Sequence, residues 1–160
     1  MVEINKKNTL KLIFLISILA LASAFFIEYV LGHQPCNLCI LERIPYLLAL
    51  TIIVLNYKFI QFERYFILLL ILIFLAATIL SLYHLGIEQG FIEESLVCDL
   101  KTGINLLSKE EILKQLQEKN ISCKDVTFKI IGLSLTSYNI IISLLITIIS
   151  VKIYLNYDKN

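Results

Sequence analysis

Two cysteines three residues apart, Cys36 and Cys39, are the residues of this chain best suited to chemistry. The first thiol of a Cys-x-x-Cys pair has a lowered pKa when it lies near a helix N-terminus or a cation. Only the thiolate form attacks disulfides. Arg43 follows four residues after Cys39 and brings a permanent positive charge. The pattern predicts a reactive thiol beside a cation that would stabilise a negatively charged group such as a thiolate. The alternative for Arg43 is a side chain that anchors the helix by reaching the membrane surface.

A second pair of cysteines, Cys98 and Cys123, lies 25 residues apart in a polar stretch. Four cysteines can bind zinc through four thiolates. The second pair lacks the Cys-x-x-Cys spacing, however, and a long apolar hairpin separates it from the first pair. We therefore favour two dithiols over a zinc site and expect no metal.

The composition is that of an integral membrane protein. Of the 160 residues, 58% are hydrophobic and only 17% are charged, against about 45–50% and about 25% in soluble domains. The net charge of +1 gives no reason to expect a nucleic-acid partner. At this length we expect a single domain over residues 1–160.

Four apolar runs predict an all-α membrane protein, a bundle of four transmembrane helices. The run 10–31 would extend about 33 Å as a helix, enough to cross a hydrocarbon core of about 30 Å. The run from Ile44 to Leu55 is too short to cross by itself, so we expect the Cys-x-x-Cys segment to form or adjoin the first turn of that helix at the membrane surface. The predicted spans are 10–31, 40–56, 65–84 and 132–154, with external loops 32–39 and 85–130.

Three local features qualify this picture. The first run, with Ala22-Ser23-Ala24, also resembles a cleavable signal peptide, but its hydrophobicity continues past that site. Glu28 is an ionisable residue in a span and so a functional candidate, although we favour an interfacial position in the last turn. In the long loop, Ser108 and Glu111 fit a capping box, which predicts a short amphipathic helix ending near Asn120.

The four cysteines share one side of the membrane, because loops one and three of a four-span protein face the same way. Lys and Arg in short segments favour the cytoplasm. The short segments carry seven such residues, which place both termini inside: Lys6, Lys7, Lys11, Lys58, Arg64, Lys152 and Lys159. The cysteines then face the outside, where disulfides persist.

The segment Pro35-Cys36-Asn37-Leu38-Cys39-Ile40-Leu41-Glu42-Arg43 resembles the signature of the bacterial disulfide-bond-formation protein B family, DsbB with its related DsbI branch. Residues 83–90, Tyr-His-Leu-Gly-Ile-Glu-Gln-Gly, and 132–134, Gly-Leu-Ser, are also similar to segments of that family. The four spans and the order of the cysteine pairs extend the resemblance over nearly the whole chain.

The resemblance implies a role for each site residue. Cys98 would form a mixed disulfide with a periplasmic thioredoxin-fold thiol oxidase (DsbA-like), and Cys123 would pass electrons to Cys36. Cys39 would make a charge-transfer contact with a membrane quinone, ubiquinone or menaquinone, with Arg43 beside the ring. His84 would match the family's histidine near the quinone; the alternative for His84 is a polar cap on the third span.

The resulting hypothesis is a quinone-dependent thiol:disulfide oxidoreductase of the bacterial inner membrane, with redox-active pairs Cys36–Cys39 and Cys98–Cys123. One alternative, a conduit carrying electrons outward, needs thiols on the cytoplasmic side, and none is predicted there. The other is a membrane scaffold subunit whose four cysteines form static disulfides. The sequence does not distinguish a general oxidase from a branch serving dedicated clients.

Overall fold

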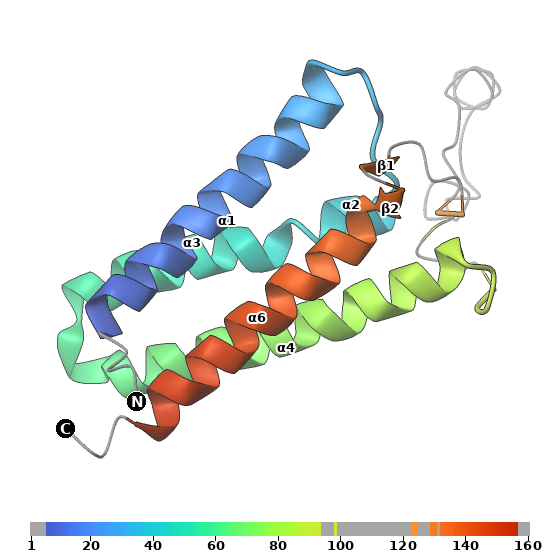
Figure 1. The fold of residues 1–160 in the computed structure, drawn as a ribbon. Helices are drawn as coiled ribbons and strands as arrows, with labels where there is room; N and C mark the ends of the chain where they lie inside the picture. The colour runs from blue at the N-terminus through green and yellow to red at the C-terminus, as the bar shows by residue number, and fades with distance from the viewer. Residues whose placement is uncertain (1–5, 94–97, 99–122, 125–128, 131, 157–160) are drawn as a thin grey trace, which may run out of the picture.

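The computed structural model describes residues 6–93, 98, 123–124, 129–130 and 132–156 (Figure 1). Within these ranges the chain forms five α-helices, one 3-10 helix and one two-stranded antiparallel sheet. Their bounds are α1 Lys6–Tyr29, α2 Asn37–Leu41, α3 Ile44–Lys58, η1 Ile60–Phe62, α4 Glu63–Glu88, β1 Lys129–Ile130, β2 Leu133–Ser134 and α6 Leu135–Leu155. The predicted amphipathic helix near residues 108–120 lies outside the described residues.

Four helical segments are long and apolar enough to cross a membrane: Lys6–Tyr29, Asn37–Lys58, Ile60–Glu88 and Leu135–Leu155. The protein is thus an all-α membrane protein with four spans, as the sequence predicted. The second segment reaches 22 residues because the short helix α2 precedes α3 directly. The backbone N–H of Arg43 donates to the carbonyl of Ile40 at 3.1 Å across the junction, and Pro45 occupies the first turn of α3, where a missing N–H costs little.

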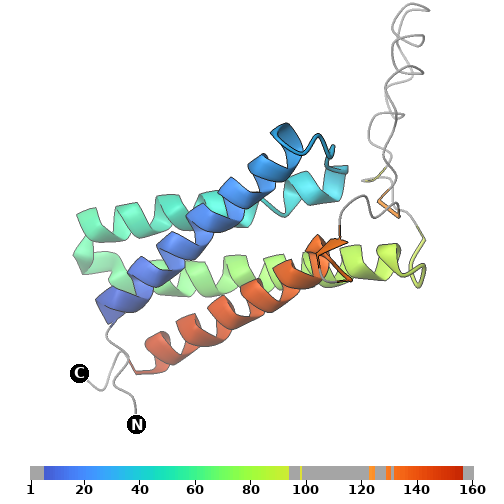
Figure 2. The same cartoon turned by 45° about the horizontal axis from the view of Figure 1, so that its top comes forward.

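The helices pack in two neighbouring pairs, α4 with α6 and α1 with α3, and α3 also contacts α4. The start of α1, the end of α3, the start of α4 and the end of α6 lie together at one end of the bundle (Figures 1 and 2). An ion pair of 2.7 Å between Lys6 and Glu63 joins α1 to α4 there. Arg64, 5.3 Å from the ring of Tyr154, joins α4 to α6 at the same end. Helix α2 and the end of α4 lie at the opposite end.

The centre of the bundle is apolar, and so is most of its outside. Phe74 of α4 is fully buried and meets the ring of Tyr46 edge-on at 5.6 Å. Large apolar side chains nevertheless point outward from the bundle, for example Val54, Leu72 and Ile79, each more than half exposed. A helix that is hydrophobic all round belongs in a membrane, so these outer faces are the surfaces that lipid covers.

The last span begins later than the sequence predicted. We expected it from residue 132, but α6 starts at Leu135. Gly132 has a φ of 81°, in the left-handed region that ends regular structure, and it forms the turn of the β1–β2 hairpin. Ser134 then acts as N-cap, its hydroxyl accepting from the backbone N–H of Ser137 at 3.3 Å.

Candidate functional site

Cys36 and Cys39 lie where the chain enters the second span. Cys36 is the N-cap of α2, and its Sγ accepts a hydrogen bond from the backbone N–H of Cys39 at 3.3 Å. Residues three apart share one face of a helix, and the two Sγ atoms are 2.7 Å apart. Cys36 is buried and Cys39 is partly exposed. The local fold therefore holds the two sulfurs in position for a bond between them.

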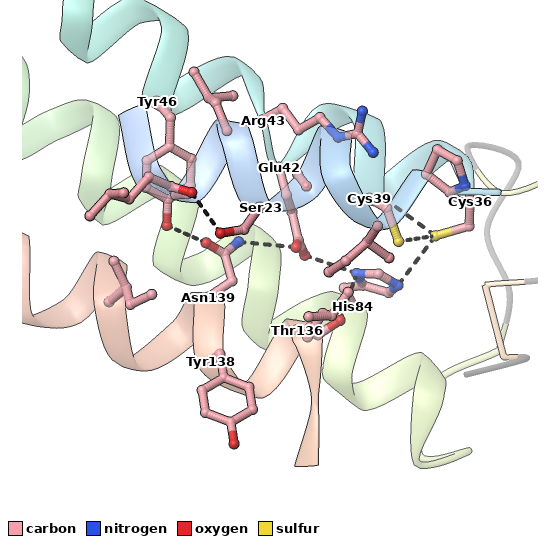
Figure 3. A pocket seen from close by; sticks show the side chains of 18 of the residues that line it. Ser23, Cys36, Cys39, Glu42, Arg43, Tyr46, His84, Thr136, Tyr138 and Asn139 are labelled. Carbon is pink, nitrogen blue, oxygen red and sulfur yellow. Dashed lines mark hydrogen bonds and ion pairs between the residues drawn. The ribbon is translucent and has the colours of Figure 1, made fainter. Parts of the chain in front are cut away.

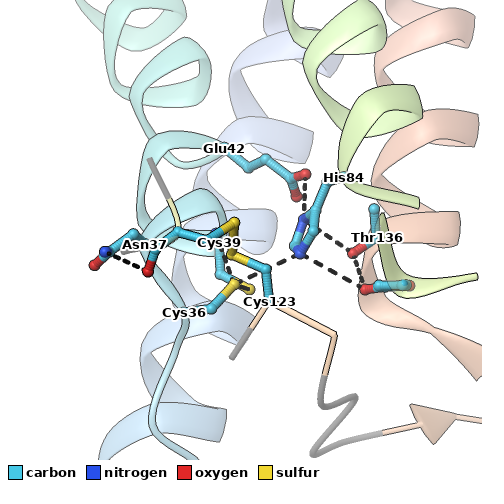
Figure 4. Close-up of a disulfide and its surroundings, with 9 residues drawn as sticks. Cys36, Asn37, Cys39, Glu42, His84, Cys123 and Thr136 are labelled. Atoms are coloured by element: carbon cyan, nitrogen blue, oxygen red, sulfur yellow. Dashed lines mark hydrogen bonds and ion pairs between the residues drawn. A yellow bond between two sulfur atoms is a disulfide. The ribbon is translucent and has the colours of Figure 1, made fainter. Parts of the chain in front are cut away.

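The second pair lies against the first. Cys98 and Cys123 form a disulfide with Cα atoms 5.9 Å apart. Cys123 is buried and packs in one cluster with Cys36, Leu38 and Ile87 (Figure 4). The side-chain amide of Asn37 donates to the carbonyl of Cys98 at 3.3 Å, which ties the second pair to the start of α2. All four sulfurs thus gather at one end of the bundle.

Arg43 does not contact the sulfurs. Its Nη1 donates to Glu28 Oε2 at 2.5 Å, and its guanidinium lies 5.1 Å from the ring centre of Phe25. Both members of the ion pair are mostly buried. Glu28 lies in the last turn of α1, as we expected, and it is the partner of Arg43, so that it joins α1 to the start of α3.

His84 lies beside the sulfur of Cys36. It is buried on α4, with Nε2 3.5 Å from Cys36 Sγ and Nδ1 2.9 Å from Glu42 Oε1. A polar cap on the third span would reach water, so that alternative for His84 is excluded. Thr136 Oγ1, on α6, lies 3.3 Å from Nδ1 and donates to Glu88 Oε1 at 2.5 Å.

Glu42 continues this hydrogen-bonded chain into the bundle (Figure 3). Its Oε2 accepts from Asn139 Nδ2 at 3.0 Å, and the same nitrogen lies 2.8 Å from Ser81 Oγ. The hydroxyl of Tyr46 donates to Asn139 Oδ1. The network therefore connects α3, α4 and α6 with the Cys36 sulfur at one end.

Sequence reasoning missed Glu42, Glu88, Thr136 and Asn139 as site residues. A usable signal was present for the two acids, because ionisable residues within spans are functional candidates by default. We applied that rule to Glu28 alone. Thr136 and Asn139 carried no such signal, since polar residues at the start of a span are common.

The thiol of Cys36 is acidic in this environment. The hydrogen bond from the Cys39 side chain is the largest cause, and a hydrogen bond and positive charge from His84 add to it, while burial opposes them. Together they lower the pKa of Cys36 from 9.0 to about 5. In the reduced protein Cys36 is consequently a thiolate at neutral pH, the form that reacts with disulfides.

The Cys36, Cys39 and His84 ligand atoms lie within 4.8 Å of one another, so a metal site has to be considered. Two thiolates on one tetrahedral zinc, each about 2.3 Å from the metal, would be roughly 3.8 Å apart. The observed 2.7 Å between the sulfurs is much shorter. The arrangement suits sulfur–sulfur exchange better than metal binding.

A cavity of about 640 Å³ opens beside these residues. Cys39, Arg43 and Glu42 line its polar end, and side chains of α1 and α6 form long apolar walls (Figure 3). The wall residues include Ile16, Leu19, Leu21, Ile27, Ile142, Leu145, Ile146 and Ile149. Apolar walls with a few polar groups at one end are typical of pockets that bind small molecules.

Four spans that bring two cysteine pairs together at one membrane surface define a membrane protein of thiol–disulfide exchange. Comparison with known sequences identifies the group within that class. The family model described as Disulfide bond formation protein DsbB matches residues 6–153, and the chain belongs to this family. It is accordingly a multi-pass membrane thiol:disulfide oxidoreductase.

A curated relative supports the same relationship. The uncharacterized protein RP370 of Rickettsia prowazekii (strain Madrid E) is 33% identical over 147 residues, which cover 91% of this chain and 85% of the relative. The similarity therefore extends over both proteins almost from end to end.

Proposed function

We propose that this protein reoxidises a soluble thioredoxin-fold thiol oxidase and passes the electrons to a membrane quinone. The observation that carries the proposal is the packing of Cys123 against Cys36 in one buried cluster, beside a cavity that Cys39 lines. Electrons can then pass from one cysteine pair to the other and on to a lipid-soluble acceptor.

The donor side is read from the exposure of the second pair. Cys98 is partly exposed, whereas Cys123 is 3% exposed. A thiolate of the soluble partner attacks Cys98 Sγ, forms a mixed disulfide and releases Cys123 as a thiolate. Cys123 then attacks Cys36 Sγ of the Cys36–Cys39 disulfide, and Cys39 leaves as a thiolate. The second thiolate of the partner resolves the mixed disulfide and frees Cys98, and Cys98 then resolves the Cys123–Cys36 bond and releases Cys36 as a thiolate.

The acceptor side is the cavity. A bound quinone supplies a two-electron oxidant that a lipid bilayer can deliver. Cys39 and Arg43 at the polar end would hold its ring, and the apolar walls from α1 and α6 would hold its tail. The ion pair with Glu28 keeps Arg43 at the edge of this space. The type of quinone, ubiquinone or menaquinone, stays open.

The proposed orientation places the cysteines in the periplasm and both termini in the cytoplasm of the bacterial inner membrane. Lys6, Lys58, Arg64 and Lys152 belong to helix ends remote from the sulfurs. An excess of Lys and Arg in short segments favours the cytoplasmic side. The whole chain 1–160 would then act as one integral membrane domain.

The decisive experiment uses the purified protein in vesicles that contain a quinone, with a reduced thioredoxin-fold oxidase added outside. We expect quinone reduction that Cys39→Ser abolishes. Cys123→Ala should accumulate a mixed disulfide on Cys98, and Cys98→Ser with Cys123→Ala should not. Full turnover by Cys39→Ser would contradict the proposed path.

The alternative of a scaffold with static disulfides predicts a different response in cells. Static bridges stay oxidised when quinone is depleted, whereas relay cysteines accumulate as thiols. Trapping free thiols with a maleimide before and after depletion separates the two, and thiols that stay absent would favour the scaffold.

A further inference from the structure

We propose that His84 is the general base of Cys36, and that Glu42, fixed by Asn139, is the positioning residue that orients His84. This inference deepens the proposed function, since it rests on Cys36 being a redox thiol. His84 also lines the cavity, and the inference concerns its contact with Cys36. A nucleophile, a base in contact with it and a third group that orients the base are the parts of an activated nucleophile.

The first step of the argument is the tautomer of His84. Nδ1 faces two groups, the Glu42 carboxylate at 2.9 Å and Thr136 Oγ1 at 3.3 Å. The Thr136 hydroxyl hydrogen is already donated to Glu88 Oε1 at 2.5 Å, so Thr136 offers only an acceptor to the ring. With two acceptors around it, Nδ1 carries the hydrogen. Nε2 then presents its lone pair to Cys36 Sγ, 3.5 Å away.

The second step is the orientation of Glu42. Its Oε1 accepts from His84, and its Oε2 accepts from Asn139 Nδ2 at 3.0 Å. The Asn139 amide is itself fixed, because the Tyr46 hydroxyl donates to Oδ1. With a donor on each oxygen, the Glu42 side chain is fixed in orientation, with Oε1 facing His84.

The third step is the remaining surroundings of His84. The titratable groups that face its ring are Cys36 and Cys39 at the start of α2, Glu42 from the α2–α3 junction and Glu88 from α4 itself. Glu88 Oε1 lies 3.8 Å from Nε2, and Glu88 Oε2 is buried without a hydrogen-bond partner among the described residues. Arg43, the nearby cation, is engaged by Glu28. His84 therefore lies among two acidic side chains and the Cys36 sulfur.

The chemical step is a proton transfer that needs no external reagent. The S–H bond of Cys36 breaks, an N–H bond forms at Nε2, and the products are a Cys36 thiolate and an imidazolium bound to Glu42. The same imidazolium stabilises Cys36 when it leaves a disulfide, because a leaving thiol of lower pKa departs faster. The lowered pKa of Cys36 agrees with this geometry.

The test measures the pH dependence of Cys36 alkylation by iodoacetamide in the reduced, full-length protein in detergent, with Cys36 and Cys39 quantified separately by mass spectrometry. In the unmodified protein we expect a midpoint at about pH 5. His84→Gln should raise the midpoint by more than about one unit, and Glu42→Gln should raise it by a smaller amount. Tyr46→Phe, which removes only the hydroxyl that holds Asn139, should raise it least.

The matched control is Glu63→Gln, the same substitution in an ion-paired glutamate at the other end of the bundle. It should leave the midpoint unchanged. An unchanged midpoint in His84→Gln, or equal shifts in Glu42→Gln and Glu63→Gln, would overturn the inference. If circular dichroism shows that the His84→Gln variant has lost its helical structure, the alkylation midpoints of Glu42→Gln and Tyr46→Phe test the inference instead. The alkylation assay contains no quinone and no partner protein. A failure of quinone reduction in the vesicle experiment would therefore refute the proposed function without changing the alkylation result.

Discussion

The ion pair between Glu28 and Arg43 offers a quantitative test of how the first two spans are joined. The perturbations are Glu28→Gln, which keeps the shape of the side chain, Arg43→Met, which keeps its length, and the double variant. Each single change leaves the other charge without its partner. Arg43→Met also removes the contact of the guanidinium with Phe25 at 5.1 Å.

The expected loss of stability follows from how deeply the ion pair is buried. Breaking an exposed ion pair costs up to about 1 kcal/mol, and breaking a buried one costs about 3–5 kcal/mol. The two side chains are 15% and 22% exposed, so Glu28→Gln should destabilise the protein by about 2 kcal/mol. Arg43→Met should cost about 0.5–1 kcal/mol more, because the cation–aromatic contact is also lost.

The assay is equilibrium unfolding in mixed micelles by titration with sodium dodecyl sulfate, followed by circular dichroism. A double-mutant cycle isolates the pairwise term. The double variant should be destabilised by much less than the sum of the two single variants, with a coupling energy of at least about 1 kcal/mol.

Additive effects would refute the reasoning, since they would mean that the two charges do not stabilise each other in the folded state. A double variant more stable than the native protein would still fit, because replacing a buried ion pair by uncharged groups is often neutral or stabilising. The Lys6–Glu63 pair, more exposed at Lys6, is the internal comparison and should give a smaller coupling.

Three further predictions use the same unfolding measurement. Phe74→Ala should cost about 3–5 kcal/mol, because the ring is fully buried and its loss leaves a cavity; a loss below about 1 kcal/mol would contradict the packing. Gly132→Ala should lower the free energy of unfolding by about 1 kcal/mol. The cost is backbone strain alone, because φ is 81° and no atom lies within 4 Å of the added carbon. Gly132→Asn should cost less. The free energy of unfolding of the reduced protein, measured relative to that of the Cys36→Ser variant, should decrease as the pH falls from 9 towards 5. The reason is that the pKa of Cys36 is lower in the folded state than in the unfolded state. A stability difference that does not change with pH would argue against a thiolate in the folded state.

Most of the fold could be read from the sequence because membrane spans depend on local composition. A span needs a sufficiently long apolar run and internal backbone hydrogen bonds, and both are properties of contiguous residues. The four spans were predicted for this reason. The start of the last span was not, because it depends on Gly132 at positive φ and on the Ser134 cap, which are details of backbone geometry.

The candidate site was only partly predictable. The proximity of the Cys36 and Cys39 sulfurs, which are 2.7 Å apart, followed from their spacing, since a three-residue separation places both side chains on one helix face. The partner of Arg43 did not, because Glu28 lies fifteen residues earlier on another helix. The same applies to Asn139, whose contact with Glu42 spans 97 positions.

The sequence by itself determined that this is a four-span membrane protein with a Cys-x-x-Cys pair at the start of its second span, because hydrophobic length and residue spacing act over short stretches of chain. Only the tertiary structure decided which groups surround each sulfur. It directed Arg43 to Glu28 and brought His84 to Cys36, because helix rotation and tilt are set by packing between helices. Those contacts, rather than the motif alone, establish the electrostatic environment in which Cys36 reacts.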